Sequence, residues 1–415
     1  MNNKSYGRKL YLTGLLFLPV TVCLFIVSLF SDKLVNKPLS IVMLILSALF
    51  LFLIVFGFIL SCKNKNRKFK KVFKILLILF FIIYYLGSTG VMILFYGPNK
   101  SFRNWLITSA MTTMEHQYFA YWFYGDDIIN LVLDDNSVIE TENETDEQLV
   151  SVGSIDFDKL IYKNEYEEQV LTKDEGNDLY KIIDISRDGY KGKLAVIYDP
   201  SKVKIGTAKN IGTSLDTSNG QYLVDISKRY NAVIAVNASG FVDPEYNSTG
   251  GVPRGYVISN GKLVIDNVWG RGYGGLVGFD NNNKLILSTS MTSSQAISKG
   301  IRDAVQYGPF LVVNGKQSYI KGNGGWGIAP RTAIGQREDG IVLLLTIDGR
   351  QIGSPGADMG DLAQIMVDYG AVNASNMDGG TSTAMILNHK IISNPRNGSF
   401  KPVTRPIPDG WIVVK

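Results

Sequence analysis

Three side chains of this 415-residue chain stand where chemistry on a charged substrate is possible. Asp348 follows an apolar run that is typical of a buried strand, Asp378 follows a predicted strand that leads into Asn376-Met377, and each precedes a glycine. A carboxylate in that position can act as a nucleophile or a general base, although Asp-Gly is also a common turn. Arg331 opens another strand-like run, and its planar guanidinium suits a phosphate or a carboxylate, or a plain surface ion pair. These three are the candidate catalytic residues.

A second set of polar residues could bind such a substrate. Asp378 opens a glycine-rich segment that ends in hydroxyl residues, where backbone N–H groups can point at an anion. The segment lacks the lysine of a P-loop, and a plain turn between strands is the alternative. Asn237 and Ser239 follow the apolar run 232–236, where they can bond a ligand or form an Asx turn. The candidate substrate-binding residues are Asn237, Ser239, Arg350, Gly379, Gly380, Thr381, Ser382 and Arg405.

The scarcity of histidine and cysteine limits the chemistry further. His116 and His389 are the only imidazoles, so a zinc site with three histidines is excluded. The two cysteines, Cys23 and Cys62, lie near the N-terminus and leave the rest of the chain without a thiol nucleophile or a disulfide framework. We therefore predict no metal and no cofactor, and we expect His116 to be structural. A site for Mg²⁺ or Ca²⁺ made of acids alone stays open as an alternative.

The elements that would position these residues alternate between short β-rich runs and turns from about residue 151 onwards. A helix is predicted from a cap at Asp358 or Asp361 to about Tyr369, and Gly370 would end it. Mixed strands with few helices predict an α+β fold with a mixed β-sheet catalytic domain. The predicted strands include Lys193–Tyr198, Ala232–Val236, Tyr256–Ser259, Gly275–Phe279, Arg331–Gln336, Ile341–Ile347, Ala384–Leu387 and Trp411–Val414.

Three uncharged apolar runs near the N-terminus predict three transmembrane helices: Leu12–Phe30, Leu39–Leu60 and Ile75–Phe95. Each approaches or exceeds the roughly 20 residues that a helix needs to cross a bilayer. Residues 1–100 hold 13 basic residues and one acid, and many of the basic residues fall at 63–74. By the positive-inside rule the N-terminus would be cytoplasmic and the rest of the chain extracytoplasmic, in a multi-pass protein of the cell membrane.

These features predict three regions: a membrane anchor at 1–96, an amphipathic stalk helix with an acidic linker at 97–150, and a catalytic domain at 151–415. The helix would cover about 101–133, and the acids from Asp134 to Glu147 would form a solvated linker. The chain after residue 100 carries a net charge of −7. That balance argues against a nucleic-acid partner, because such proteins need a basic excess to neutralise phosphates.

Taken as a set, the polar segments resemble the phosphodiester glycosidase family over about residues 180–415. The N-terminal part resembles the anchors of members linked to exopolysaccharide. The glycine-rich loop of the family usually reads DGGGS, whereas here Thr381 stands at the third glycine and adds a Cβ. The resemblance rests on Asn237–Phe241, Gly308-Pro309, Asn314-Gly315, Pro330–Gly335, Asp348-Gly349-Arg350, Asn376–Thr383 and Thr404-Arg405-Pro406.

The resemblance implies an enzyme that hydrolyses a sugar 1-phosphodiester in a surface polysaccharide or glycoconjugate and leaves a phosphomonoester on the other partner. Phosphate is already a good leaving group, so the main demands are neutralising its charge and stabilising an oxocarbenium-like centre. Arg331 and Arg405 would hold the phosphate with the loop Gly379–Ser382. None of this requires a histidine.

The carboxylates Asp348 and Asp378 would act as nucleophile or base, in an order that the sequence does not assign. Asn237 would orient a sugar hydroxyl. Two other functions stay open: a component of polysaccharide or teichoic-acid assembly that binds the polymer without cutting it, and a metal-dependent phosphodiesterase that breaks the P–O bond.

Overall fold

The structure is a computed structural model, and its described residues form two compact units. The first comprises Met1–Ile107 with Tyr118–Leu133, and the second comprises Thr108–Gln117 with Asp134–Lys415. Each unit is considered by itself. The described residues are 3–30, 45–50, 52–54, 86–87, 90, 93–97, 100–112, 117–157, 159–243, 248–267, 274–397, 399 and 401–415.

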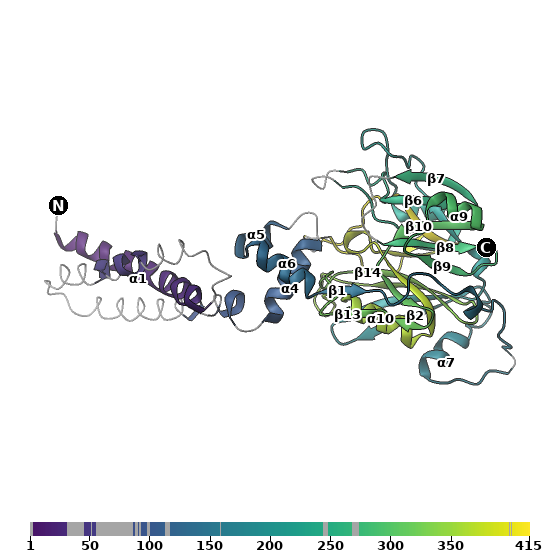
Figure 1. Cartoon of the computed structure of the whole chain (residues 1–415), viewed down its shortest axis with the longest axis horizontal. Coiled ribbons are helices and arrows are strands. Elements are labelled where there is room, and N and C mark those ends of the chain that lie inside the picture. Colours follow the sequence, from purple (N-terminus) through teal and green to yellow (C-terminus); the bar gives the residue numbers. More distant parts are fainter. Residues whose placement is uncertain are drawn as a thin grey trace. The chain divides into compact units, whose positions relative to one another are not determined.

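The first unit is helical (Figure 1). Its aromatic residues pack only in part: the rings of Phe95 and Phe123 are 4.3 Å apart, whereas Trp122 is 68% exposed. The single helix expected over 101–133 is instead divided, because Gly125 interrupts it and its carbonyl accepts the first bonds of the next helix. His116 lies outside the described residues. The helices are α1 (Asn3–Phe30), α4 (Lys100–Thr112, which ends in the second unit), α5 (Tyr118–Phe123) and α6 (Asp126–Asp134).

The prediction of three transmembrane helices is wrong. Across the part of the chain that the structure describes, no helix combines the length and the apolar character needed to cross a bilayer. The prediction relied on the absence of charge in each run. The first run is only part of α1, which begins at Asn3 and includes Lys4, Arg8 and Lys9, and its Phe17 stacks on Phe50 at 5.2 Å. The runs 39–60 and 75–95 lie largely outside the described residues, as do the basic residues at 63–74.

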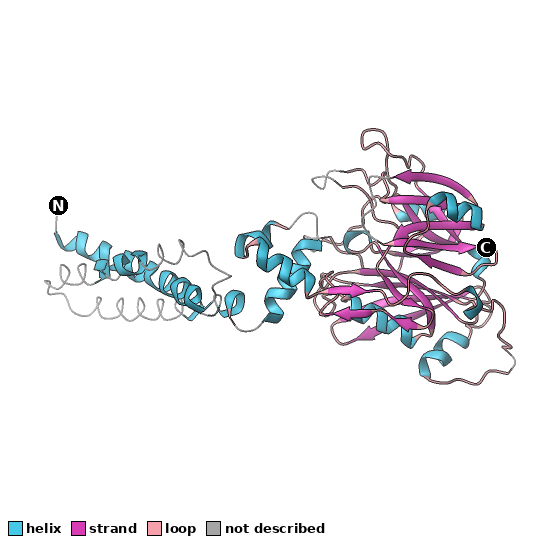
Figure 2. Cartoon of the chain, in the orientation of Figure 1, coloured by secondary structure: helices cyan, strands magenta, loops and turns pink. Residues whose placement is uncertain are grey.

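The second unit is a mixed α/β structure in which antiparallel sheets dominate and helices are few and short (Figure 2). A seven-stranded sheet has the order β12 (Lys316–Gln317), β11 (Phe310–Val313), β16 (Ala371–Met377), β14 (Arg331–Arg337), β15 (Val342–Ile347), β3 (Tyr190–Ile197) and β2 (Tyr180–Arg187). A five-stranded sheet has the order β18 (Lys390–Ile391), β17 (Met385–Leu387), β5 (Ala232–Asn237), β19 (Asp409–Val414) and β4 (Val203–Thr207).

Another five-stranded sheet and a two-stranded sheet complete the strands of this unit. The five-stranded sheet has the order β7 (Lys262–Asn267), β6 (Gly255–Ser259), β10 (Ile301–Tyr307), β8 (Gly275–Asp280) and β9 (Leu285–Ser288), and the pair is β1 (Ser137–Ile139) with β13 (Tyr319–Lys321). The helices are α7 (Glu165–Leu171), α8 (Leu223–Arg229), α9 (Ser293–Lys299) and α10 (Met359–Asp368), with short 3₁₀ turns η1 (Glu147–Leu149), η2 (Pro200–Lys202) and η5 (Gly380–Ser382).

The seven-stranded sheet is buried on both faces, which explains why its strand β15 reads as a nearly continuous apolar run. Along β15, Val342 and Leu344 belong to the core shared with the two five-stranded sheets. Leu343, Leu345 and Ile347 belong to the core that α10 covers on the opposite face. This double burial holds the ends of β14, β15 and β16 in fixed register.

Several local predictions are confirmed. The expected helix is α10, with Asp358 and Asp361 forming a reciprocal capping box, and Gly370 follows it at φ +81°. The acidic stretch that was expected to form a solvated linker belongs to the second unit and contacts its strands. Glu140 Oε1 accepts a hydrogen bond from Phe310 N at 2.8 Å, and β1 in the same stretch pairs with β13.

Candidate functional site

The candidate site forms at one edge of the seven-stranded sheet, where three central strands begin or end. Arg331 opens β14 and pairs with Ile347, the last residue of β15. The next residue of β14, Thr332, pairs with Met377, the last residue of β16. Antiparallel pairing therefore brings the start of one strand and the ends of two others to the same edge.

The end of β5 joins this edge from the neighbouring five-stranded sheet. Asp378 N donates to the carbonyl oxygen of Ala238 at 3.0 Å, and Asn237 Nδ2 donates to the carbonyl oxygen of Asp378 at 2.6 Å. Asn237 Oδ1 in turn accepts from Thr332 Oγ1 at 2.7 Å and from Ala384 N at 3.2 Å. Asn237 is therefore bound to protein at both ends of its amide, and it fixes Asp378; the sequence had suggested a contact to a sugar hydroxyl.

Asp378 is half-buried and faces several hydrogen-bond donors. Tyr307 Oη donates to its Oδ1 at 3.3 Å. Burial raises the pKa of Asp378 above its usual value, while a hydrogen bond from Ser382 and the charge of Arg405 oppose that rise. A carboxylate in these surroundings can accept a proton or stabilise a nearby positive charge.

Arg331 is 3% exposed, and backbone carbonyls hold its guanidinium. Nε donates to the carbonyl oxygen of Ala357 at 3.1 Å, and Nη2 donates to those of Trp326 and Gly327. Among the described residues no carboxylate forms an ion pair with it. Burial lowers the pKa of Arg331 to about 10, so the group still carries its charge at neutral pH.

The glycine-rich turn packs directly against two arginines. A Cβ on Gly379 would lie 3.5 Å from Nη1 of Arg331, and one on Gly380 would lie 3.1 Å from Nη2 of Arg350. Gly380 also has φ +63°, a conformation that favours glycine. Arg350 Nη1 donates to Thr381 Oγ1 at 3.0 Å, so the residue that departs from the family pattern ties this arginine to the turn.

Arg405 approaches Asp378 from the segment before β19. Its guanidinium forms an ion pair with Asp243 and lies over the ring of Phe241, 4.4 Å from the centroid. It is close enough to Asp378 to lower the pKa of that carboxyl. Arg331, Asp378 and Arg405 therefore surround one place, together with the Gly379–Ser382 turn.

Asp348 has different neighbours, although it follows β15 at the same sheet edge. Its Oδ1 accepts from Asn394 N at 2.7 Å. Burial raises the pKa of Asp348, and the Asn394 N–H and the charge of Lys193 oppose the rise. Within the described residues its carboxylate forms no hydrogen bond to Asp378 or Arg331. The hydrogen-bond partners of Asp348 thus differ from those of Asp378.

Two residues of this site were not anticipated from the sequence. Tyr307 ends β10 and reaches Asp378. Asp409 opens β19, is fully buried, and accepts hydrogen bonds from both N and Oγ of Ser239. Asp409 carries the same signal as Asp348, a carboxylate next to an apolar run, but here the acid comes before the apolar residues, at the start of the strand.

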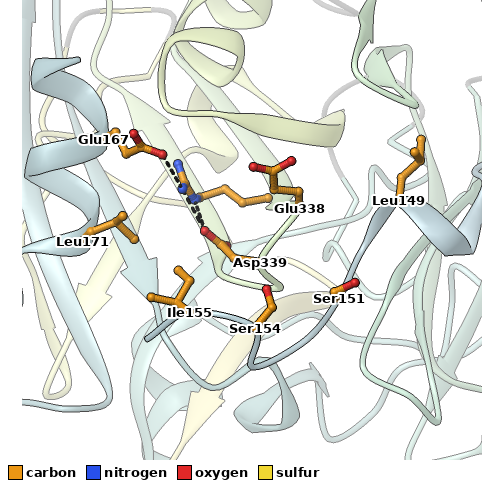
Figure 3. Close-up of a pocket in the computed structure, with 9 residues that line it drawn as sticks. Leu149, Ser151, Ser154, Ile155, Glu167, Leu171, Glu338 and Asp339 are labelled. Carbon is orange, nitrogen blue, oxygen red and sulfur yellow. Dashed lines mark hydrogen bonds and ion pairs between the residues drawn. The ribbon is translucent and has the colours of Figure 1, made fainter. Parts of the chain in front are cut away.

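A separate pocket of about 340 Å³ lies at the opposite end of β14 (Figure 3). Arg337, the last residue of that strand, binds Asp339 at 2.7 Å and Glu167 at 3.6 Å there. Because the charge of this arginine is already balanced by the two acids, the described residues that line the pocket provide no free positive charge to bind an anion. Across the described residues no group of three or more His, Cys, Asp and Glu side chains could hold a metal ion.

Residues 230–414 match the model of the phosphodiester glycosidase family. This stretch contains every candidate site residue, and the chain carries a phosphodiester-glycosidase-like domain there. The chain is 32% identical over 195 residues to the SPbeta prophage-derived uncharacterized protein YomE of Bacillus subtilis (strain 168). The match covers 45% of this chain and 29% of that protein.

Two further similarities are to forms of one enzyme from two animals. The chain is 37% identical over 68 residues to N-acetylglucosamine-1-phosphodiester alpha-N-acetylglucosaminidase of Bos taurus, covering 16% of this chain and 13% of the enzyme. The chain thus spans less than a third of either of these relatives. The auto-inhibited catalytic domain of the zebrafish enzyme is similar with a TM-score of 0.48 and 20% identity, over 59% of this chain and 86% of that domain.

Proposed function

We propose that this protein hydrolyses a sugar 1-phosphodiester at the bond between the anomeric carbon and the phosphate oxygen. The observation that carries the proposal is the buried guanidinium of Arg331, which lacks a carboxylate partner among the described residues and lies beside Gly379. A buried cation that no carboxylate contacts in an ion pair is incompletely neutralised, so an anionic substrate that binds there regains free energy. The family match over 230–414 supplies the chemical class of that anion.

In this proposal the phosphate binds the guanidinium of Arg331 next to the turn Gly379–Ser382. The planar fork of the arginine suits tetrahedral phosphate oxygens. Within the turn, Gly380 N and Ser382 N donate to the carbonyl oxygens of Pro330 and Gly379. Arg405 adds positive charge on the side of Asp378. Charge neutralisation of the leaving phosphate is then the main contribution of these groups to rate.

Asp378 supplies the carboxylate at the reacting carbon. The C–O bond breaks with its electron pair going to the phosphate, which leaves as a phosphomonoester. Asp378 stabilises the positive charge that develops at the anomeric carbon, and water adds its oxygen there and releases a proton. The phosphate needs no general acid, which agrees with a site that holds arginines and no imidazole among its described residues.

The natural substrate in this proposal is a phosphodiester-linked sugar of a surface polysaccharide or glycoconjugate. An extracytoplasmic location of the catalytic domain belongs to the same proposal, because such polymers lie outside the cytoplasm. A panel of glycosyl-1-phosphodiesters that differ in sugar and in aglycone, incubated with the full chain, identifies the preferred sugar.

The test of the reaction is hydrolysis in water enriched in ¹⁸O. Cleavage of the C–O bond places the heavy oxygen on the released sugar, whereas cleavage of the P–O bond places it on the phosphate. The Asp378→Asn variant should lose turnover, and Asp280→Asn is the matched control. Asp280 is also a buried acid that accepts two backbone N–H bonds, from Asn282 at 2.9 Å and Lys284 at 2.8 Å, but it lies at the end of β8.

Other outcomes would identify the alternatives. Heavy oxygen on the phosphate, together with loss of activity in EDTA, identifies a metal-dependent phosphodiesterase. Binding of the polymer without release of sugar or phosphomonoester identifies a non-catalytic component of polysaccharide assembly. Either result overturns the proposed reaction.

A further inference from the structure

Asp409 is a buried carboxyl that the proposed reaction does not use. It opens β19, is 0% exposed, and lies between β4 and β5 in the five-stranded sheet. Both of its oxygens bind one residue: Oδ1 accepts from Ser239 N at 2.8 Å, and Oδ2 accepts from Ser239 Oγ at 2.6 Å. A buried carboxylate whose two oxygens both accept hydrogen bonds from one serine fixes the position of that serine.

Ser239 belongs to a four-residue segment, 237–240, that contacts Asp378 on several sides. Asn237 Nδ2 donates to the carbonyl of Asp378, and the carbonyl of Ala238 accepts from its N–H. Gly240 lies against the ring of Tyr307, where a Cβ would come within 2.7 Å of Cε2, and Tyr307 Oη donates to Asp378 Oδ1. Movement of the segment would therefore shift both the backbone of Asp378 and its phenol partner.

We infer that Asp409 is the positioning residue of this site, which holds the 237–240 segment through Ser239 and thereby orients Asp378 for reaction. This inference rests on the proposed function, because it takes Asp378 as the reacting carboxylate. Asp409 itself is too deeply buried to touch a substrate. Removing Asp409 should therefore lower kcat more than it changes KM.

Few charged or titratable groups surround Asp409 among the described residues. Burial raises its pKa to about 6, and the negative charge of Asp378 adds to the rise. Across the sheet it pairs with Thr207 of β4, which is contacted by Arg229 and by Tyr230 Oη. Because interacting sites influence each other's ionisation, the charge on Asp378 should be detectable in the titration of Asp409.

Kinetics of three variants of the full chain separate positioning from general destabilisation. In Asp409→Ala, loss of the Ser239 contacts should lower kcat about 100-fold with KM within about threefold of wild type. Asp409→Asn keeps an acceptor for Ser239 N, so its kcat should be about tenfold higher than that of Asp409→Ala. Asp280→Asn, the buried acid on the other sheet, should leave both constants within about twofold.

A second measurement does not depend on activity. The pH dependence of urea unfolding reports the titration of Asp409, and in Asp378→Asn the inflection attributed to Asp409 should move to lower pH, because the neighbouring negative charge is gone. If the wild-type chain cleaves no glycosyl phosphodiester but this shift occurs, the proposed function fails and the coupling of the two carboxyls stands. Wild-type kcat in both Asp409 variants, or an inflection that Asp378→Asn does not move, overturns the inference.

Discussion

Arg331 and Gly379 lie so close that a side chain on Gly379 would contact the guanidinium, which places the buried cation beside the glycine-rich turn. A Cβ on Gly379 would lie 3.5 Å from Arg331 Nη1 and 2.8 Å from the carbonyl oxygen of Pro330. The glycine therefore lets the backbone of the turn approach both the arginine and the start of β14. A substrate phosphate that binds this guanidinium would therefore also lie next to the turn.

The first prediction follows from this contact. Gly379→Ala places a methyl group against a backbone oxygen that cannot move aside easily, so the turn must shift. We expect the free energy of unfolding to fall by about 1–3 kcal/mol and kcat/KM to fall at least about tenfold. Urea unfolding and steady-state kinetics measure the two effects. In Gly125→Ala the new methyl group has nothing within 4 Å, and neither quantity should fall.

The second prediction concerns the two carboxylates that the sequence singled out. Asp378→Asn should lower kcat about 1,000-fold or more, because the charge that faces the reacting carbon is lost. Asp348→Asn should lower it no more than about threefold, because that carboxylate accepts from Asn394 N and forms no ion pair with Arg331 among the described residues. Equal losses in the two variants, with both proteins folded by circular dichroism, would restore Asp348 to the catalytic pair.

The third prediction uses inorganic phosphate as a probe of Arg331. Phosphate that binds only the folded protein stabilises it, by about 2.7 kcal/mol at a concentration of 100 times Kd. Arg331→Lys keeps the charge but loses the planar fork that donates to three carbonyls, so most of this stabilisation should disappear. Thermal melting with and without phosphate measures the difference. Arg337→Lys, at the other end of β14, should retain the phosphate effect, and loss of it there would show that phosphate acts elsewhere.

The fourth prediction is a dependence of stability on pH that comes from Asp409. Its pKa is about 6 in the folded protein and 3.8 as the ordinary value, so the native state holds a proton between these limits that the unfolded state has lost. The contribution of Asp409 to the free energy of unfolding is therefore complete below about pH 4, decreases as the pH rises, and is lost above about pH 6. The total is about 3 kcal/mol.

Asp409→Asn removes that titration while keeping an acceptor for Ser239 N. The free energies of unfolding of wild type and variant should therefore diverge between pH 4 and pH 7, with the wild type losing more. Urea unfolding at unit steps of pH provides the comparison. A constant difference across this range would mean that Asp409 is ionised throughout.

Much of the local structure could be predicted from the sequence because local rules govern it. The apolar run before Asn237 forms β5, and the capping pair at Asp358 and Asp361 begins α10. Side-chain pattern and caps decide such elements within a few residues. The transmembrane prediction, made from the length and the lack of charge of each run, failed: no described helix is long and apolar enough to cross a bilayer, and the first run belongs to a longer helix with a basic start.

The sequence by itself determined which residue types are available: arginines, carboxylates and a glycine-rich turn at the ends of apolar strands, with hardly any imidazole or thiol. It could not decide which of these meet, because neighbours in a sheet come from distant parts of the chain. Asp348 and Asp409 look alike in sequence, each an acid beside an apolar run. Only the placing of β19 beside β5 brings Asp409 to Ser239 and into the field of Asp378, while the other acid turns to Asn394.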